Sequence, residues 1–183
     1  ANHKSKKPIP PPDAAIAVAQ ASADRMPIGT SHAPAVVLPD DEIRKLYHEM
    51  LLLRRFEERT AQMYQMQKIK GFCHLYIGQE AVAVGSVHAL QPQDYIFTTY
   101  RDHAHALIRG ISPRGVMAEL FAKATGCSKG KGGSMHLFNA ETRMMGGNGI
   151  VAGHVPVATG TAFKSAYNGL PEVTVCYFGD SVT

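Results

Sequence analysis

The sequence predicts an α/β fold built around a parallel sheet. Segments whose apolar residues recur at helical spacing alternate with short runs rich in β-branched and aromatic residues. Glycine or proline separates most of these segments, as is typical of the ends of helices and strands. Helices that alternate with strands along a chain usually cover a parallel sheet.

The first predicted element is a long helix over residues 40–70. Its first turn holds the acidic residues 40–42, and negative charge there complements the helix dipole. Apolar residues then recur at helical spacing from Ile43 onward, and Gly71 stands where a terminating glycine is expected. We expect this helix to be scaffold.

Four further elements are predicted before residue 126. The chain turns at Pro92, Gly110 closes a helix, and Ser112 followed by Pro113 caps the start of the next one. These elements are a helix over residues 79–90, a strand over 95–100, and helices over 101–109 and 112–123.

The last part of the chain begins with a stretch crowded with glycines. We expect no packed element over residues 126–153, because glycine is unfavourable inside helices and strands. A helix is predicted over 156–167, with Gly169 past its end, and a strand over 173–178. Because a buried strand needs further structure to cover it, we expect this chain to be the front part of a longer protein.

The composition is that of a globular protein and excludes two classes. Of 183 residues, 45% are hydrophobic and 19% are charged, which fits one domain over residues 40–183. A flexible arm rich in proline and alanine, residues 1–39, is expected to precede it. No apolar run is long enough for an integral membrane protein, and a net charge of +4 is too modest for a dedicated nucleic-acid binder. The three cysteines form no close pair, which favours a reducing, intracellular setting.

Two glycine-rich segments suit the binding of a ligand through the backbone. The segment 126–136 combines glycines with lysines, a mixture found in anion-binding loops and in ordinary flexible loops alike. Its order matches neither the Walker A nor the Rossmann pattern. In the segment 146–156, glycines flank an apolar pair just before a helix, which suits contact with a flat ligand or a tight connection.

Two further candidates follow predicted strands, where ligands of doubly wound sheets bind. Asp180 follows the strand over 173–178, and a carboxylate there either holds a magnesium ion or caps a helix. Arg101 directly follows the run over 95–100, where its guanidinium can bind a phosphate through two hydrogen bonds. His103 and His105 point to different sides of a helix, so we expect both to be structural.

Five short motifs occur in a fixed order over roughly residues 40–183. They are CHLYIGQEA at 73–81, TYRDH at 99–103, KGKGGSMH at 129–136, GGNGIV at 146–151 and GD at 179–180. Together they resemble the alpha subunit of the thiamine-diphosphate-dependent 2-oxoacid dehydrogenases, most closely the pyruvate dehydrogenase type. One such motif alone would be weak evidence, but five in order are highly specific.

The resemblance implies a fold, cofactors and partners. The fold would be a doubly wound thiamine-diphosphate-binding domain, truncated here after a sheet strand, with thiamine diphosphate and magnesium as cofactors. A beta subunit would complete an α2β2 heterotetramer, with the cofactor between the two chains. The reaction would be decarboxylation of pyruvate and transfer of the acetyl group to a dihydrolipoyl acyltransferase. The compartment would be the cytoplasm in a bacterium, and the mitochondrial matrix or a plastid in a eukaryote.

The resemblance also implies which residues hold the organic cofactor. Tyr100 and Arg101 would contact the diphosphate. The Gly149 carbonyl and the Val151 amide would meet the aminopyrimidine. A positive Arg101 would favour an anionic substrate.

The remaining implied roles concern the metal and the substrate. Asp180 would bind magnesium, and Ser181 and Val182 would lie on the diphosphate. His74 is the implied catalytic residue, lining the pocket near the reacting substrate, and a positive charge on it would also favour an anionic one.

One departure from the family pattern keeps alternatives open. Ser181 stands where the metal motif usually has glycine, so it either weakens cofactor binding or adds a hydroxyl to the site. A non-catalytic subunit that only binds the beta partner is therefore one alternative, and the alpha subunit of acetoin dehydrogenase is another. The branched-chain type fits less well, because its loop lacks the KGKGG run.

Overall fold

The computed structural model describes residues 37–182. Three parallel strands form its sheet: β1 (Tyr95–Thr99), β2 (Met144–Asn148) and β3 (Thr174–Cys176). Their order is β2-β1-β3, so the first strand in sequence lies in the middle. Ile96 pairs with Met144 on one side and with Val175 on the other. The predicted parallel sheet is confirmed, whereas the predicted arm falls almost wholly outside the described residues and stays a prediction.

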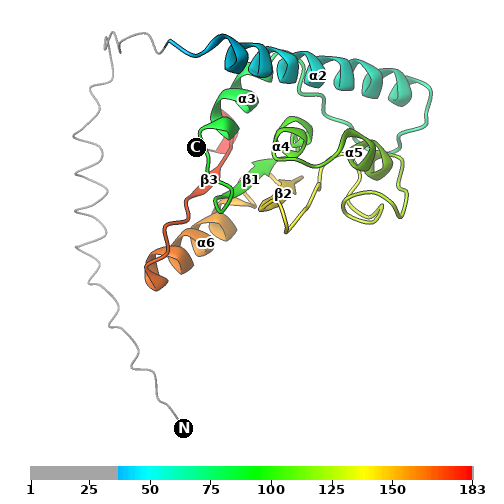
Figure 1. The fold of residues 1–183 in the computed structure, drawn as a ribbon. Coiled ribbons are helices and arrows are strands. Elements are labelled where there is room, and N and C mark those ends of the chain that lie inside the picture. The colour runs from blue at the N-terminus through cyan, green and yellow to red at the C-terminus, as the bar shows by residue number, and fades with distance from the viewer. Residues whose placement is uncertain (1–36, 183) are drawn as a thin grey trace. The chain divides into compact units, whose positions relative to one another are not determined.

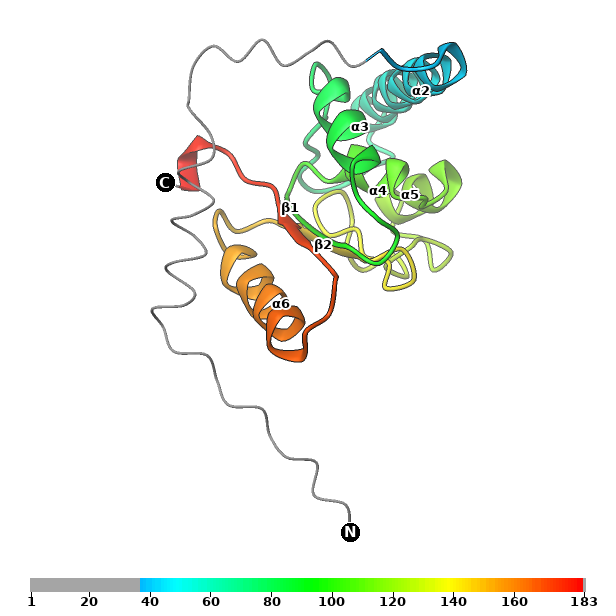
Figure 2. The same cartoon turned by 60° about the vertical axis from the view of Figure 1, so that its left-hand side comes forward.

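Helices cover both faces of this sheet. Figures 1 and 2 show α6 (Val155–Asn168) on one face and α3 (Glu80–His88) and α4 (His103–Ile108) on the other. The long α2 (Asp40–Gln65) packs on α3, and α5 (Pro113–Leu120) packs on α4. This layering confirms the doubly wound α/β fold.

The strand order places a topological switch point beside β1. The chain crosses from β1 to β2 through α4 and α5, and from β2 to β3 through α6 on the opposite face. Two crossovers that leave on opposite faces open a crevice between the carboxyl ends of β1 and β3. The single-turn helix η1 (Asp180–Val182) follows β3 at this edge.

Helix ends match the sequence in some places and differ in others. The Ser112 hydroxyl accepts the Gly115 amide at 3.0 Å, and Gly169 has a φ of +64° past the end of α6, so both predicted caps are confirmed. The predicted end of the first helix is wrong. Gln67 adopts a φ of +58° and the Lys68 amide donates to the Met63 carbonyl at 2.9 Å, which closes α2 well before Gly71.

Strand β2 corrects the expectation that the glycine-rich stretch holds no packed element. Its sequence, MMGGN, includes two glycines that leave room for neighbouring groups. A Cβ on Gly147 would lie 2.2 Å from Asp102 Oδ2, and one on Gly146 would lie 2.2 Å from the ring of Phe138. Pairing with β1 therefore forms this strand, and the glycines allow it to lie close to its neighbours.

Buried polar contacts tie α2 to the segments that carry the motifs. Glu57 Oε1 lies 2.9 Å from His103 Nδ1 and accepts the Tyr76 amide at 3.2 Å. His103 Nε2 faces the Ser134 hydroxyl at 2.8 Å. Burial alone would lower the pKa of His103, but the carboxylate of Glu57 outweighs burial and raises it. His103 is therefore structural, as the sequence predicts.

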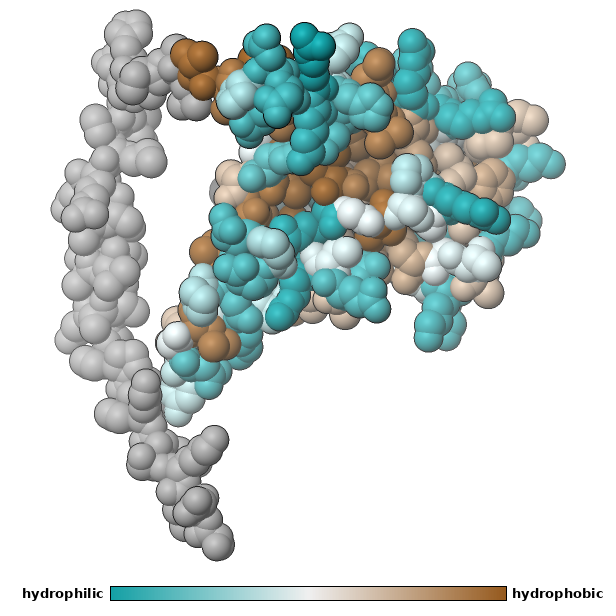
Figure 3. All heavy atoms as spheres, viewed as in Figure 1, coloured by the Kyte–Doolittle hydropathy of each residue, from teal (hydrophilic) through white to brown (hydrophobic). Residues whose placement is uncertain are grey.

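The hydrophobic core lies between the sheet and the helices on the α3–α4 face. Its fully buried members come from α2, α3, β1, α4, α5, β2 and the loop before β2, and include Leu53, Ala83, Ile96, Ala104, Val116, Leu137 and Met144. Figure 3 shows hydrophobic residues gathered in the middle of the molecule, below the largely hydrophilic outer side of α2. No helix within residues 37–182 combines the length and apolar character that a membrane span requires.

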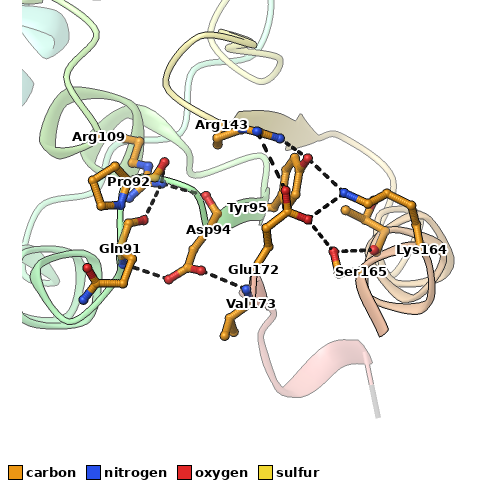
Figure 4. A network of polar contacts seen from close by, with 11 residues as sticks. Gln91, Pro92, Asp94, Tyr95, Arg109, Arg143, Lys164, Ser165, Glu172 and Val173 are labelled. Carbon is orange, nitrogen blue, oxygen red and sulfur yellow. Dashed lines mark hydrogen bonds and ion pairs between the residues drawn. The ribbon is translucent and has the colours of Figure 1, made fainter. Parts of the chain in front are cut away.

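A polar network holds the amino ends of the strands together (Figure 4). Asp94 Oδ1 accepts the Val173 amide at 2.8 Å, which joins the start of β1 to the start of β3. Arg109 donates to the Asp94 carbonyl at 2.6 Å. Glu172 accepts from Lys164 at 2.7 Å, and this hydrogen bond lowers the pKa of the Glu172 carboxyl.

Candidate functional site

The carboxyl ends of β1 and β3 border a cavity of about 330 Å³. The segment Thr98–Arg101 lines it from β1, and the segment Tyr177–Val182 lines it from β3. Val151, which follows β2, closes a third side. The cavity therefore lies at the switch point, where doubly wound sheets bind their ligands.

Six of the eight predicted site residues line this cavity. They come from three separate parts of the chain and are Tyr100, Arg101, Val151, Asp180, Ser181 and Val182. His74 and Gly149 do not line it. The ring of His74 lies beside that of Tyr100, with centroids 4.5 Å apart, and Gly149 lies next to His136.

Arg101 supplies positive charge at the cavity. Its Nη1 donates to the Leu75 carbonyl at 2.5 Å, the one side-chain hydrogen bond of Arg101 within residues 37–182. A guanidinium carries five N–H donors, so one fixes the side chain while others are available to an anion. The Arg101 guanidinium also lies 5.9 Å from the centre of the Tyr100 ring.

His74 does not share this positive charge. Burial is the main cause that lowers its pKa, and the nearby charge of Arg101 lowers it further. A lowered pKa favours the neutral imidazole at neutral pH. Of the two cationic groups that the sequence suggested, the structure therefore favours Arg101.

Two buried polar side chains at the cavity have no hydrogen-bond partner among the described residues. They are Thr98, through its hydroxyl, and His105, through both ring nitrogens. The ring of His105 packs between Tyr76 and Tyr177, with centroids 5.1 and 4.2 Å away. Burial lowers the pKa of His105 to about 4, which the nearby Arg101 carbonyl only partly offsets, so this imidazole is neutral. Buried groups of this kind are normally satisfied, which marks the cavity as a place for a polar ligand.

Sequence reasoning missed His105 as a cavity residue and expected it to be only structural. The sequence offered no signal for it, because Arg101, four residues earlier, lies outside α4, and the burial of His105 between Tyr76 and Tyr177 is a tertiary property. Thr98 carried no signal of its own within the β-rich run.

The glycine–lysine segment is not open to a ligand through its amides. The backbone N–H groups of Ser128, Gly130, Gly132 and Gly133 all donate to the buried carboxylate of Glu119. The sequence left open a loop that binds an external anion and an ordinary flexible loop. The structure shows neither, because the loop folds around a carboxylate of its own chain.

Asp180 is the metal-ligand candidate at the cavity. Residues 37–182 contain no group of three or more His, Cys, Asp and Glu side chains placed to hold a metal. Magnesium commonly uses one or two carboxylates together with phosphate oxygens of a ligand, so a single carboxylate at a cavity that also holds Arg101 suits it.

Comparison with known proteins gives the family. The family described as "Dehydrogenase E1 component" matches residues 48–183, most of the chain. The chain belongs to the dehydrogenase E1 component family. This confirms the family resemblance carried by the five motifs.

Similar proteins of this E1 family are named "Pyruvate dehydrogenase E1 component subunit alpha". That of Rhizobium meliloti is 57% identical over 136 residues, which cover 74% of this chain and 39% of the relative. Those of Rickettsia bellii and Porphyra purpurea are both 52% identical, over 76% and 75% of this chain and 43% and 42% of the relative. The chain therefore spans about two fifths of the length of these curated relatives.

Proposed function

We propose that this chain is the N-terminal part of the alpha subunit of a pyruvate dehydrogenase. The enzyme would decarboxylate pyruvate oxidatively and pass the acetyl group to the lipoyl group of a dihydrolipoyl acyltransferase. The observation that carries the proposal is the single cavity at the switch point, which gathers Tyr100, Arg101 and Asp180 from distant parts of the chain. The names of the E1 relatives support it.

The residues at the cavity fit thiamine diphosphate and magnesium. Arg101 offers guanidinium donors to a diphosphate, and Asp180 offers a carboxylate to the cation. The unpartnered groups of Thr98 and His105 offer further hydrogen bonds at the buried side. When bound, thiamine diphosphate supplies the electron sink for the loss of carbon dioxide from a 2-oxo acid. The protein supplies placement and charge.

The chain's own residues divide the remaining tasks. Tyr100 and Arg101 would hold the diphosphate, with Ser181 and Val182 beside it. The Gly149 carbonyl and the Val151 amide would meet the aminopyrimidine. His74, neutral and beside Tyr100, would exchange hydrogen bonds with the reacting substrate without adding charge.

Exposed apolar side chains around the site support a partner chain. Ile150 is 74% exposed, and Phe178 and Val151 are about half exposed at 52% and 48%. Apolar groups of this size beside a ligand cavity are typical of surfaces that another chain covers. We infer that a beta subunit covers them in an α2β2 heterotetramer, in the cytoplasm of a bacterium or in the mitochondrial matrix or a plastid of a eukaryote.

A direct assay tests this function. The full-length alpha subunit, assembled with its beta subunit, is supplied with pyruvate, branched 2-oxo acids or acetoin, and decarboxylation or acetoin cleavage is measured. We expect pyruvate to be preferred. Preference for acetoin would overturn the substrate assignment. Absence of saturable thiamine diphosphate binding in calorimetry would favour the non-catalytic alternative.

Arg101→Ala in the same assembly tests the placement of the diphosphate. Loss of a charged hydrogen-bond donor to an anion should weaken cofactor binding by about 1.5–3 kcal/mol, with a smaller effect on the apparent affinity for pyruvate. Titration calorimetry measures this loss. Arg55→Ala is the matched control, because Arg55 pairs with Glu58 on the exposed side of α2. An unchanged cofactor titration for Arg101→Ala would refute the assignment.

A further inference from the structure

Glu119 is a buried acid whose carboxylate is surrounded by backbone amides. Glu119 lies in α5 and is 0% exposed to solvent. Its Oε2 accepts the Ser128 and Gly130 amides at 2.8 Å each, and its Oε1 accepts the Gly132 and Gly133 amides at 2.7 and 3.2 Å. Successive amides that converge in this way form an anion-binding concavity. The anion inside it belongs to the chain itself.

The glycines of this loop are explained by the same arrangement. A Cβ on Gly126 would lie 2.3 Å from Glu119 Oε2. Gly130 has a φ of +76°, and a Cβ there would lie 2.7 Å from the carbonyl carbon of Ala122. Side chains at these positions would push the loop away from the carboxylate. The KGKGG run therefore fits the internal acid and needs no external phosphate.

A chain of hydrogen bonds leads from this loop to the end of β2. The Ser128 hydroxyl donates to the His136 carbonyl at 2.9 Å. His136 Nδ1 in turn donates to the Gly147 carbonyl at 3.0 Å. The other ring nitrogen of His136 would lie 3.4 Å from a Cβ on Gly149. Glu119 is thus connected through Ser128 and His136 to Gly147, two residues before Gly149.

We propose that Glu119 is a positioning residue that folds the loop 126–133 and, through it, holds Gly149 in place for the cofactor. Glu119 touches no ligand. It replaces the anion that such a loop would otherwise bind, and it fixes the backbone from the loop to β2. The second half of this proposal rests on the proposed function, since Gly149 is the residue expected to meet the aminopyrimidine.

Glu119→Gln in the full-length assembled enzyme tests both halves. The amide keeps the shape of the side chain but turns an NH2 group toward two of the four backbone donors, which repel it. Trypsin should cleave after the exposed Lys129 and Lys131 about tenfold faster, and the dissociation constant of thiamine diphosphate should rise about tenfold. Glu141→Gln is the matched control, because Glu141 is an exposed acid just before β2, and it should change neither quantity.

Each outcome decides one half of the proposal. If Glu119→Gln resists trypsin as well as the wild type does, Glu119 does not fold the loop. If the loop is cleaved faster but the affinity for thiamine diphosphate is unchanged, the loop does not position Gly149. Arg101→Ala separates this inference from the proposed function, because it should lose cofactor affinity while the loop stays protected. If Arg101→Ala binds cofactor normally, the placement of the diphosphate on Arg101 fails. If the assembled wild type binds no thiamine diphosphate, the proposed function fails while the trypsin result for Glu119 still stands.

Hydrogen exchange in the wild-type enzyme tests the loop without any substitution. The four amide protons directed at Glu119 should exchange slowly, because each is held in a hydrogen bond to a buried carboxylate. Rapid exchange at these positions would overturn the proposal even if Glu119→Gln failed to fold.

Discussion

The two ends of the sheet differ in how their polar side chains are paired. At the amino ends of the strands, the carboxylates of Asp94 and Glu172 each accept several hydrogen bonds. At the cavity beside the carboxyl ends, the side chains of Thr98 and His105 have no hydrogen-bond partner within residues 37–182. Paired groups at the amino ends stabilise the fold. The Thr174 hydroxyl at the start of β3 is also unpaired within the described residues, but Thr174 does not line the cavity. The unpaired groups of Thr98 and His105 do line it and cost stability unless a ligand satisfies them, which identifies that end as the functional one.

The largest expected effect is at the amino ends. Asp94 is 4% exposed and accepts the Val173 and Gln91 amides at 2.8 Å each. Asp94→Ala leaves both donors buried without an acceptor, so the free energy of unfolding should fall by about 3–4 kcal/mol. Equilibrium unfolding of the full-length subunit in urea measures this. The folded variant should bind cofactor as the wild type does, and the exposed Asp41→Ala serves as the control. If Asp94→Ala unfolds with the same free energy as the wild type, the paired groups at the amino ends do not stabilise the fold.

The second prediction concerns pH and the carboxyl ends. The pKa of His105 is about 4 in the folded protein and near 6.5 when unfolded, so protons bind the unfolded state more readily. Its contribution to stability is complete above pH 6.5 and falls by up to about 3 kcal/mol as the pH drops to 4. His105→Phe keeps a ring between Tyr76 and Tyr177 but cannot titrate. As the pH falls from 7 to 4, the free energy of unfolding should decrease less for the variant than for the wild type. A difference in unfolding free energy that does not change with pH would contradict a buried, neutral imidazole.

The smallest expected effect on stability comes from a comparison of two buried threonines. Thr98 and Thr60 are both buried, but only the Thr60 hydroxyl has a partner, the Phe56 carbonyl at 2.9 Å. Thr60→Val should lose about 1 kcal/mol of stability, whereas Thr98→Val should lose none. In cofactor titrations the order should reverse, with only Thr98→Val binding thiamine diphosphate several-fold more weakly. Equal stability losses in the two variants would show that Thr98 is satisfied in the folded subunit.

The elements that the sequence predicted well carry their signals in their own side chains. The run of β-branched and aromatic residues in β1 and the cap at Ser112 depend only on near neighbours. Strand β2 escaped prediction because Gly146 and Gly147 have no side chains to form a pattern, and its pairing with β1 is a long-range contact. The end of α2 at Gln65 depends on a left-handed residue, Gln67, for which the sequence offers no sign.

The candidate site divides in the same way. The sequence motifs predicted Arg101 and Asp180 as site residues, and both line the same cavity in the structure. The roles of His105 and Glu119 depend on what surrounds them in three dimensions. Burial and the absence or presence of partners are tertiary properties, so neither residue could be assigned from its neighbours in the chain.

The close approach of Gly147 to Asp102 and to the backbone of Met135 restricts what residue 147 can become in evolution. Asp102 is fully buried, and its Oδ2 accepts the Leu137 amide at 2.8 Å in the space that a Cβ at residue 147 would need. A Cβ at 147 would also lie 2.5 Å from the backbone carbonyl oxygen of Met135, so a shorter residue at 102 does not by itself make room for alanine. Among descendants of this gene, residue 147 should therefore stay glycine even where residue 102 has become smaller.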